Sequence, residues 1–166
     1  KDRAMIAIID YGMGNLRSVQ KAFEAVGRRA EVTSDPHVIA RSSHVILPGV
    51  GAFADAMAEL TRTGLGQAFV EAVRDGRPCL GVCLGLQLLF ETSLEDGEHQ
   101  GLGLLPGRVV RFAAQPGLKV PHMGWNTLRA RRSVPLLQGL EVEPSVYFVH
   151  SYHAAPGRSE DVIAES

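Results

Sequence analysis

The stretch RPCLGVCLGLQLLFET, residues 77–92, holds both cysteines of the chain, Cys79 and Cys83. It starts as a short apolar run, passes through the letters GVCLG, and continues into a leucine-rich segment. This order predicts a buried strand over Pro78 to Val82 and a helix that begins at Leu84 and carries Leu88 and Leu89. Gly-x-Cys-x-Gly is the spacing of a nucleophile elbow, a strand-to-helix turn too sharp for side chains on the flanking residues.

Strands and helices alternate before this turn. Apolar runs predict strands at 5–9, 31–33 and 45–47. Residues at helical spacing predict the intervening helices: Leu16, Val19, Phe23 and Val26; the Asp35-Pro36 opening; Phe53, Met57 and Leu60; and Leu65, Phe69 and Val73. Because the strands are apolar throughout and do not alternate with polar residues, they indicate a parallel sheet covered on both faces.

The second half of the chain changes character. Short β-like pieces lie between glycine- and proline-containing turns, at 109–112, 119–121, 127–128, 146–152 and 162–164, and 134–140 has room for one helical turn. We therefore predict an α/β fold: a doubly wound, mostly parallel sheet with helices on both faces and an antiparallel extension in the second half. Without a linker or repeat, 5–166 is expected to be a single domain, and 1–4 a remnant ahead of the native Met5.

Composition narrows the possible partners. The net charge of −1 gives no case for binding nucleic acid or an anionic membrane, and the run Arg129, Arg131 and Arg132 is expected to be a solvated loop. No apolar stretch reaches the ~20 residues of a membrane helix. Two cysteines favour a reducing compartment, the cytoplasm. Cys-x3-Cys lacks the second ligand pair of a zinc site, so no metal is expected.

A glycine-rich loop at 12–14 invites a dinucleotide interpretation, which fails. The third glycine of G-x-G-x-x-G would fall at Arg17, a large charged residue. We expect a tight turn there and no cofactor.

Reactive groups of an open parallel sheet collect at the carboxyl ends of its strands, where Cys83 is predicted to lie. A helix that begins at Leu84 would stabilise its thiolate and offer N–H groups to a negatively charged oxygen. Many free cysteines are only small buried hydrophobes. That interpretation suits Cys79, inside the apolar strand; the elbow spacing favours catalysis for Cys83. The loop at 48–51, PGVG, would lie at the same edge and supply a second oxyanion donor.

These motifs carry a resemblance to a known family. The stretch 81–87, GVCLGLQ, resembles the nucleophile motif of class I, triad-type glutamine amidotransferases. Four further stretches resemble the glutaminase subunits of imidazole glycerol phosphate synthase, from histidine biosynthesis: IIDYGMGNLRSV (8–19), LPGVGAF (47–53), KVPHMGWN (119–126) and YFVHSYH (147–153). The elbow is shared by many amidotransferases, whereas PHMGWN with the N-terminal loop is far more specific.

The resemblance implies a mechanism and a partner. Cys83 would attack the side-chain amide of glutamine, release ammonia and leave a thioester that water hydrolyses. The implied site comprises the N–H groups of Val50 and Leu84 as oxyanion donors, with Gly51, Gln87, Glu95, Ser151 and Tyr152 around glutamine. Ammonia would pass to a (β/α)8-barrel cyclase subunit. The implied interface residues are Asn15, Arg17, Trp125 and Tyr147.

One part of the family pattern is missing. The base and the group that orients it come from a C-terminal His-x-Glu segment in this family, and the sequence contains no His-Pro-Glu. His122 and His150 belong to other family stretches, and His153 has no neighbouring carboxylate at a triad-like spacing. We therefore expect that 5–166 lacks its C-terminal segment and that a polypeptide ending at Ser166 is inactive.

Two alternatives stay open from the residues. One is the glutaminase component of another amidotransferase, of the aminodeoxychorismate or anthranilate type, against which PHMGWN argues. The other is a catalytically idle relative that binds a partner. The missing His-x-Glu favours the idle relative, whereas the intact Cys83, Gln87 and PGVG loop argue against it.

Overall fold

The computed structural model describes residues 5–117 and 119–166, so the expected N-terminal remnant, 1–4, lies outside the described residues. Its main sheet contains β1 (Ile6–Ile9), β2 (Ala30–Thr33), β3 (His44–Gly49) and β4 (Cys79–Cys83), in the order β2-β1-β3-β4. All three pairings are parallel, which confirms the predicted sheet. The register pairs Gly49 with Cys83, so the ends of β3 and β4 lie level at the carboxyl edge.

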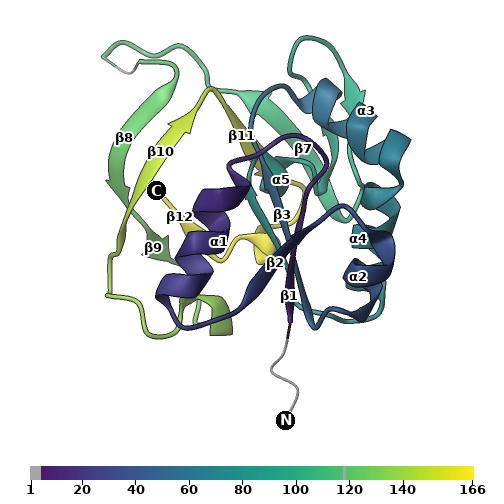
Figure 1. The fold of residues 1–166 in the computed structure, drawn as a ribbon. Helices are drawn as coiled ribbons and strands as arrows, with labels where there is room; N and C mark the ends of the chain where they lie inside the picture. Colours follow the sequence, from purple (N-terminus) through teal and green to yellow (C-terminus); the bar gives the residue numbers. More distant parts are fainter. Residues whose placement is uncertain (1–4, 118) are drawn as a thin grey trace.

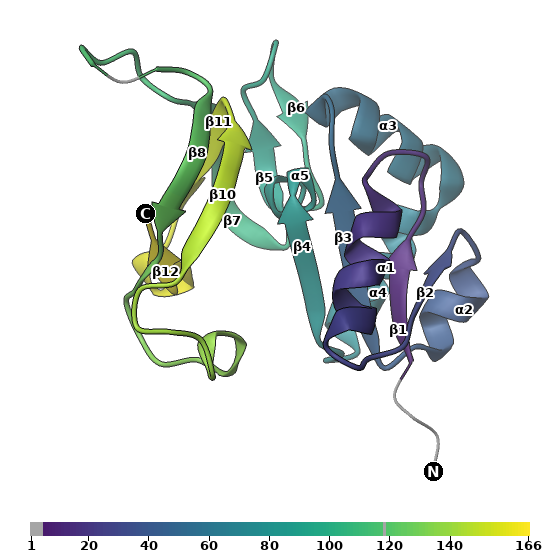
Figure 2. The ribbon, with the colours of Figure 1, turned by 60° about the vertical axis from the view of Figure 1, so that its left-hand side comes forward.

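Helices cover this sheet on both faces (Figures 1 and 2). They are α1 (Leu16–Ala25) on one face and α2 (Pro36–Arg41), α3 (Phe53–Thr63) and α4 (Leu65–Arg74) on the other. Alternate residues of β1 serve the two faces: Ile8 packs in the cluster with α1, and Ile9 packs in the larger cluster with α2 to α4. Both residues are fully buried. The doubly wound arrangement follows from this two-sided burial and is confirmed.

The second half forms small sheets beyond β4 (Figure 2). One sheet has the order β11-β7-β5-β6, from β5 (Phe90–Ser93), β6 (His99–Gln100), β7 (Leu105–Arg111) and β11 (Tyr152–Pro156). Two antiparallel ribbons pair β8 (His122–Thr127) with β10 (Ser145–His150), and β9 (Arg129–Ala130) with β12 (Ala164–Glu165). Single 3-10 turns are η1 (Pro135–Leu137) and η2 (Ser159–Asp161). The expected antiparallel strands and helical turn are present; among the described strands of this half, β5 and β7 form the one parallel pair.

The helix after the elbow is shorter than predicted. It is α5 (Leu84–Gln87), a single turn of four residues. The expected continuation through Leu88 and Leu89 is wrong, because distant backbone takes their carbonyl groups. The Leu88 oxygen accepts from Leu102 N at 2.8 Å, and the Leu89 oxygen accepts from Leu104 N at 2.9 Å. The chain then turns directly into β5, a strand that its sequence did not reveal.

Strand limits in the second half also need correction. The piece predicted over 146–152 is two strands that belong to different sheets, with Ser151 between them. No strand forms over 119–121; β8 begins at His122, after Pro121, which has no N–H to donate to a ladder. The last predicted strand is displaced to Ala164–Glu165.

Candidate active site

Cys83 ends β4 in a conformation that few side chains adopt. Its φ of 56° and ψ of −117° lie in the positive-φ region, which normally favours glycine. The two flanking glycines are required by close packing. A Cβ on Gly81 would lie 2.6 Å from the Gly85 oxygen, and one on Gly85 would overlap the Leu47 carbonyl. The predicted sharp turn is therefore present, and it leaves the Cys83 thiol exposed.

The PGVG loop lies directly beside this elbow. Gly49, paired with Cys83 across the sheet, packs so closely that an added Cβ would be 3.0 Å from the Leu84 Cβ and 2.9 Å from the Gly85 nitrogen. Val50 follows at once and is half exposed. Two backbone turns, from β3 and β4, thus meet at one point of the carboxyl edge.

A buried tyrosine anchors this loop. The Tyr11 hydroxyl donates to the Pro48 oxygen at 3.0 Å, and its side chain is only 3% exposed. Burial raises the pKa of Tyr11 to about 12. Sequence reasoning missed this role; the only local signal is the position of Tyr11 directly before the glycine-rich turn that follows β1.

The elbow and the loop open into a cavity of about 440 Å³. The nucleophile Cys83 lines it, together with all seven residues that the resemblance assigns to the oxyanion hole and the substrate: Val50, Gly51, Leu84, Gln87, Glu95, Ser151 and Tyr152. Pro121, Val149 and His150 complete the lining. The structure therefore gathers residues from the loop after β3, the end of β4, α5, the loop after β5 and the β10–β11 segment around one thiol.

Two of the polar lining residues already have partners. Gln87 Nε2 donates to the Tyr152 oxygen at 3.0 Å, which ties α5 to the start of β11. Glu95 Oε2 accepts from Phe53 N at 3.0 Å, at the first residue of α3. Because Ala52, which precedes this helix, has no side-chain cap, Glu95 caps it from a distance. Each side chain keeps one oxygen, Gln87 Oε1 and Glu95 Oε1, without a described hydrogen bond.

The two cysteines differ as predicted. Cys79, at the start of β4, is half-buried and packs against the main core. Burial raises the pKa of its thiol, and the nearby Arg77 only partly offsets this effect. A higher pKa means less thiolate, which disfavours Cys79 as a nucleophile.

No triad forms among the described residues. Neither Cys83 nor any histidine has a hydrogen bond or ion pair with a partner that would complete one: His150 and His153 face the backbone oxygens of Tyr152 and Ala154. Instead His122, His150 and His153 form an aromatic cluster with Phe112 and Phe148. Each of these three histidines thus has aromatic packing partners and no described hydrogen bond to Cys83.

The residues expected at a partner interface are exposed. Trp125 and Tyr147 face each other across the β8–β10 ribbon, with ring centroids 5.6 Å apart, and are 73% and 55% exposed. Asn15 and Arg17 are exposed at the start of α1, where the Asn15 side chain accepts from Ser18 N at 3.3 Å. Trp125 is therefore not a core residue.

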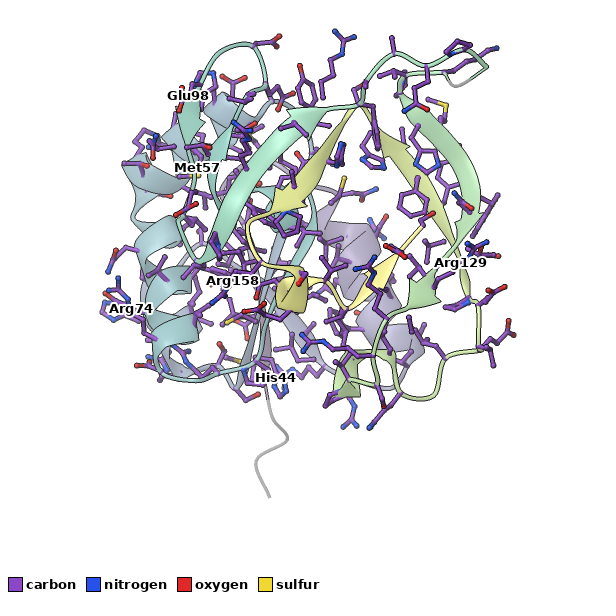
Figure 3. All side chains as sticks on the ribbon, turned by 180° about the vertical axis from the view of Figure 1, so that it is seen from behind. His44, Met57, Arg74, Glu98, Arg129 and Arg158 are labelled. Carbon is purple, nitrogen blue, oxygen red and sulfur yellow. The ribbon has the colours of Figure 1, made fainter. Side chains whose placement is uncertain are left out.

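The basic run Arg129, Arg131 and Arg132 is exposed, as expected, but Arg129 belongs to β9 and not to a loop. Arg129 lies on the side of the molecule opposite Met57 and Arg74 (Figure 3). Ion pairs partly balance the charge of the basic run: Arg129 Nε lies 3.8 Å from Glu143 Oε1, and Arg131 Nε lies 2.9 Å from Glu165 Oε2.

Within 5–117 and 119–166 we find no metal-binding group of three His, Cys, Asp or Glu side chains. None of the described helices has the length and apolar character needed to cross a membrane.

Comparisons with known proteins agree with this geometry. The family model for glutamine amidotransferase class-I matches residues 7–165. The imidazole glycerol phosphate synthase subunit HisH of Syntrophotalea carbinolica is 56% identical, over 96% of this chain and 80% of its own length. HisH of Moorella thermoacetica is 57% identical, over 95% of this chain and 74% of its own length.

Solved structures extend the likeness to the fold. A crystal structure of a glutamine amidotransferase matches 97% of this chain and 79% of its own, with a TM-score of 0.75 at 20% identity. The PurLQS structure from Thermotoga maritima matches 98% of this chain and 74% of its own, with a TM-score of 0.69 at 17% identity.

Proposed function

The chain belongs to the class-I glutamine amidotransferases, and within them to the HisH subunits of imidazole glycerol phosphate synthase, and we propose that Cys83 is the nucleophile of its glutaminase reaction. It is thus an enzyme subunit of histidine biosynthesis. The observation that carries the proposal is the positive-φ Cys83 at the carboxyl end of β4, which opens into the cavity beside the PGVG loop.

The proposed reaction proceeds through a thioester. The Cys83 sulfur attacks the side-chain carbonyl carbon of glutamine, a C–S bond forms, and the carbonyl oxygen becomes negatively charged. The N–H groups of Val50 and Leu84 would donate to that oxygen. The C–N bond then breaks as the nitrogen takes up a proton and leaves as ammonia. Water cleaves the thioester, giving glutamate and the free thiol.

Glutamine would be held by the polar lining. We assign the free oxygens of Gln87 and Glu95 to donors on the substrate, with the Glu95 carboxylate toward the α-amino group. Gly51, Ser151 and Tyr152 would border the rest of the amino acid. The support is that these residues come from distant parts of the chain and still share one cavity.

The leaving nitrogen needs a proton donor that 5–117 and 119–166 do not place. We propose that a His-x-Glu pair, as in the family, supplies it. This part of the proposal rests on the resemblance and on the lack of a described hydrogen-bond partner for Cys83.

Ammonia would pass to a (β/α)8-barrel cyclase subunit. We place that partner on the ribbon face of Trp125 and Tyr147 and on the loop with Asn15 and Arg17. The exposed aromatic pair supports this placement, because large aromatic side chains at a surface are typical interface anchors. Both cysteines are free, which suits the reducing cytoplasm as the compartment.

The test compares two thiols in the complete protein with its cyclase. Glutamate production should fall at least about 1,000-fold in Cys83→Ala, because no other group can form the thioester. Cys79→Ala is the matched control and should stay within about threefold of the unchanged protein, since this thiol only packs. Glutaminase activity that persists in Cys83→Ala would refute the proposal.

A further inference from the structure

One backbone oxygen at the rim of the cavity accepts hydrogen bonds from two side chains. The Tyr152 oxygen lies 3.0 Å from Gln87 Nε2 and 2.7 Å from His150 Nδ1. Tyr152 begins β11, an edge strand of its sheet. The neighbouring Ser151 oxygen accepts from Phe112 N at 3.0 Å, so the alternation of an antiparallel ladder turns the Tyr152 oxygen outward, away from β7. The two side chains thus replace a missing neighbouring strand.

The contact fixes Nδ1 as the nitrogen of His150 that donates. A carbonyl oxygen only accepts, so Nδ1 must carry the proton, and in the neutral ring Nε2 is then an acceptor. His150 Nε2 is buried and has no hydrogen-bond partner within 5–117 and 119–166. The ring is otherwise held by packing, at 5.1 Å from Phe112 and 5.4 Å from His122 between centroids. Its one described hydrogen bond therefore sets how the imidazole and the Tyr152 oxygen lie.

We propose that His150 is a positioning residue for the glutamine site: it holds the Tyr152 carbonyl group to which Gln87 is also bound. This inference rests on the proposed glutamine site. Tyr152, Gln87 and His150 all line the cavity, whereas the Cys83 thiol and the PGVG loop have no described bond to His150. Losing the imidazole donor would loosen the wall that binds glutamine and leave the nucleophile and the oxyanion donors in place.

The kinetic test uses three variants of the complete protein with its cyclase. His150→Phe keeps a ring in the cluster but removes the donor, and we expect KM for glutamine to rise about tenfold, the loss of one hydrogen bond, with kcat within about twofold. His150→Asn, whose amide nitrogen can take the place of Nδ1, should recover most of that KM. The matched control is His153→Phe, because the His153 ring stacks on Phe112 with centroids 4.5 Å apart and its one described hydrogen bond is to the Ala154 oxygen.

The control should keep the KM of the unchanged protein. An unchanged KM in His150→Phe would overturn the inference, and so would an equal rise in His150→Phe and His153→Phe, which would mean that only packing matters. Cys83→Ala in the same assay separates the two levels of the argument. If it stays active, the proposed site itself fails; if it is inactive and His150→Phe behaves normally, only the role of His150 fails.

A second measurement, by NMR, uses the unchanged protein and does not depend on the folding of a variant. Two-bond 15N–1H correlation spectra of histidine rings in the unchanged protein distinguish the two neutral tautomers. The proposed contact predicts the Nδ1–H form for His150. A His150 signal from the Nε2–H form would overturn the proposal, because Nδ1 could then not donate to the Tyr152 oxygen.

Discussion

Removing one buried hydroxyl should weaken both the fold and the site. Tyr11→Phe keeps the ring in the core but leaves the Pro48 oxygen without its donor at 3.0 Å. An unpaired buried carbonyl costs about 1–3 kcal/mol, so the free energy of unfolding should fall by that amount at about pH 8. Urea unfolding of the complete protein, followed by circular dichroism, measures this loss.

The same substitution should change the response to alkali. Burial raises the pKa of Tyr11 from 10.0 to about 12. Between these values the unfolded tyrosine loses its proton and the folded one keeps it, so the unfolded state binds fewer protons and Tyr11's contribution to stability falls as pH rises. Each pH unit above about 10 removes about 1.4 kcal/mol of that contribution. The stability gap between the unchanged protein and Tyr11→Phe should therefore shrink from about pH 10 to 11.

Tyr147→Phe serves as the control, because its ring is 55% exposed and its stability should change by less than about 0.5 kcal/mol. Since Tyr11 anchors the residue two positions before Val50, Tyr11→Phe should lower kcat more than it changes KM. The role of Tyr11 would be refuted if Tyr11→Phe were as stable as the unchanged protein at about pH 8 and remained so up to about pH 11.

Three further changes test the elbow, the cap and the interface. Gly85→Ala forces a methyl group onto the Leu47 carbonyl and should lower the free energy of unfolding in urea by more than about 3 kcal/mol. The control Gly64→Ala has open space at φ 73° and should lower it by about 1–2 kcal/mol. Equal losses would contradict the close packing at Gly85. Glu95→Gln should lower stability by less than about 1 kcal/mol yet raise KM for glutamine severalfold; an unchanged KM would remove Glu95 from the substrate site. Trp125→Ala should leave the melting temperature unchanged, because the side chain is exposed, and should weaken cyclase binding at least about 30-fold in titration calorimetry. An unaltered affinity would show that Trp125 is not part of the interface.

The sequence was sufficient where local patterns decide the structure. The parallel sheet follows from apolar runs with a helix between each pair, and the elbow follows from glycines on either side of Cys83. Both are confirmed. The single-turn length of α5 could not be predicted, because Leu102 and Leu104, far along the chain, take the carbonyl groups that would have continued the helix.

Long-range hydrogen bonds explain most of what the sequence did not reveal at the site. Tyr11 and Pro48 are 37 positions apart, and Gln87 and Tyr152 are 65 positions apart. No spacing rule relates such pairs. The hydrogen bond that anchors the PGVG loop and the one from Gln87 to the Tyr152 oxygen are therefore seen only in the structure. The residues that line the cavity were expected from a family resemblance, because motif matches carry long-range information that periodicity does not contain.

The identity of the nucleophile can be measured directly with a glutamine-shaped electrophile. We would treat the complete protein and its cyclase with a diazoketone analogue of glutamine, then sequence the peptide that contains both cysteines by tandem mass spectrometry. The exposed thiol at the elbow predicts a single adduct on Cys83, suppressed by excess glutamine, with Cys79 unmodified because burial raises the pKa of its thiol. An adduct on Cys79, or labelling of Cys83 that glutamine does not prevent, would contradict the assignment of this cavity as the glutaminase site.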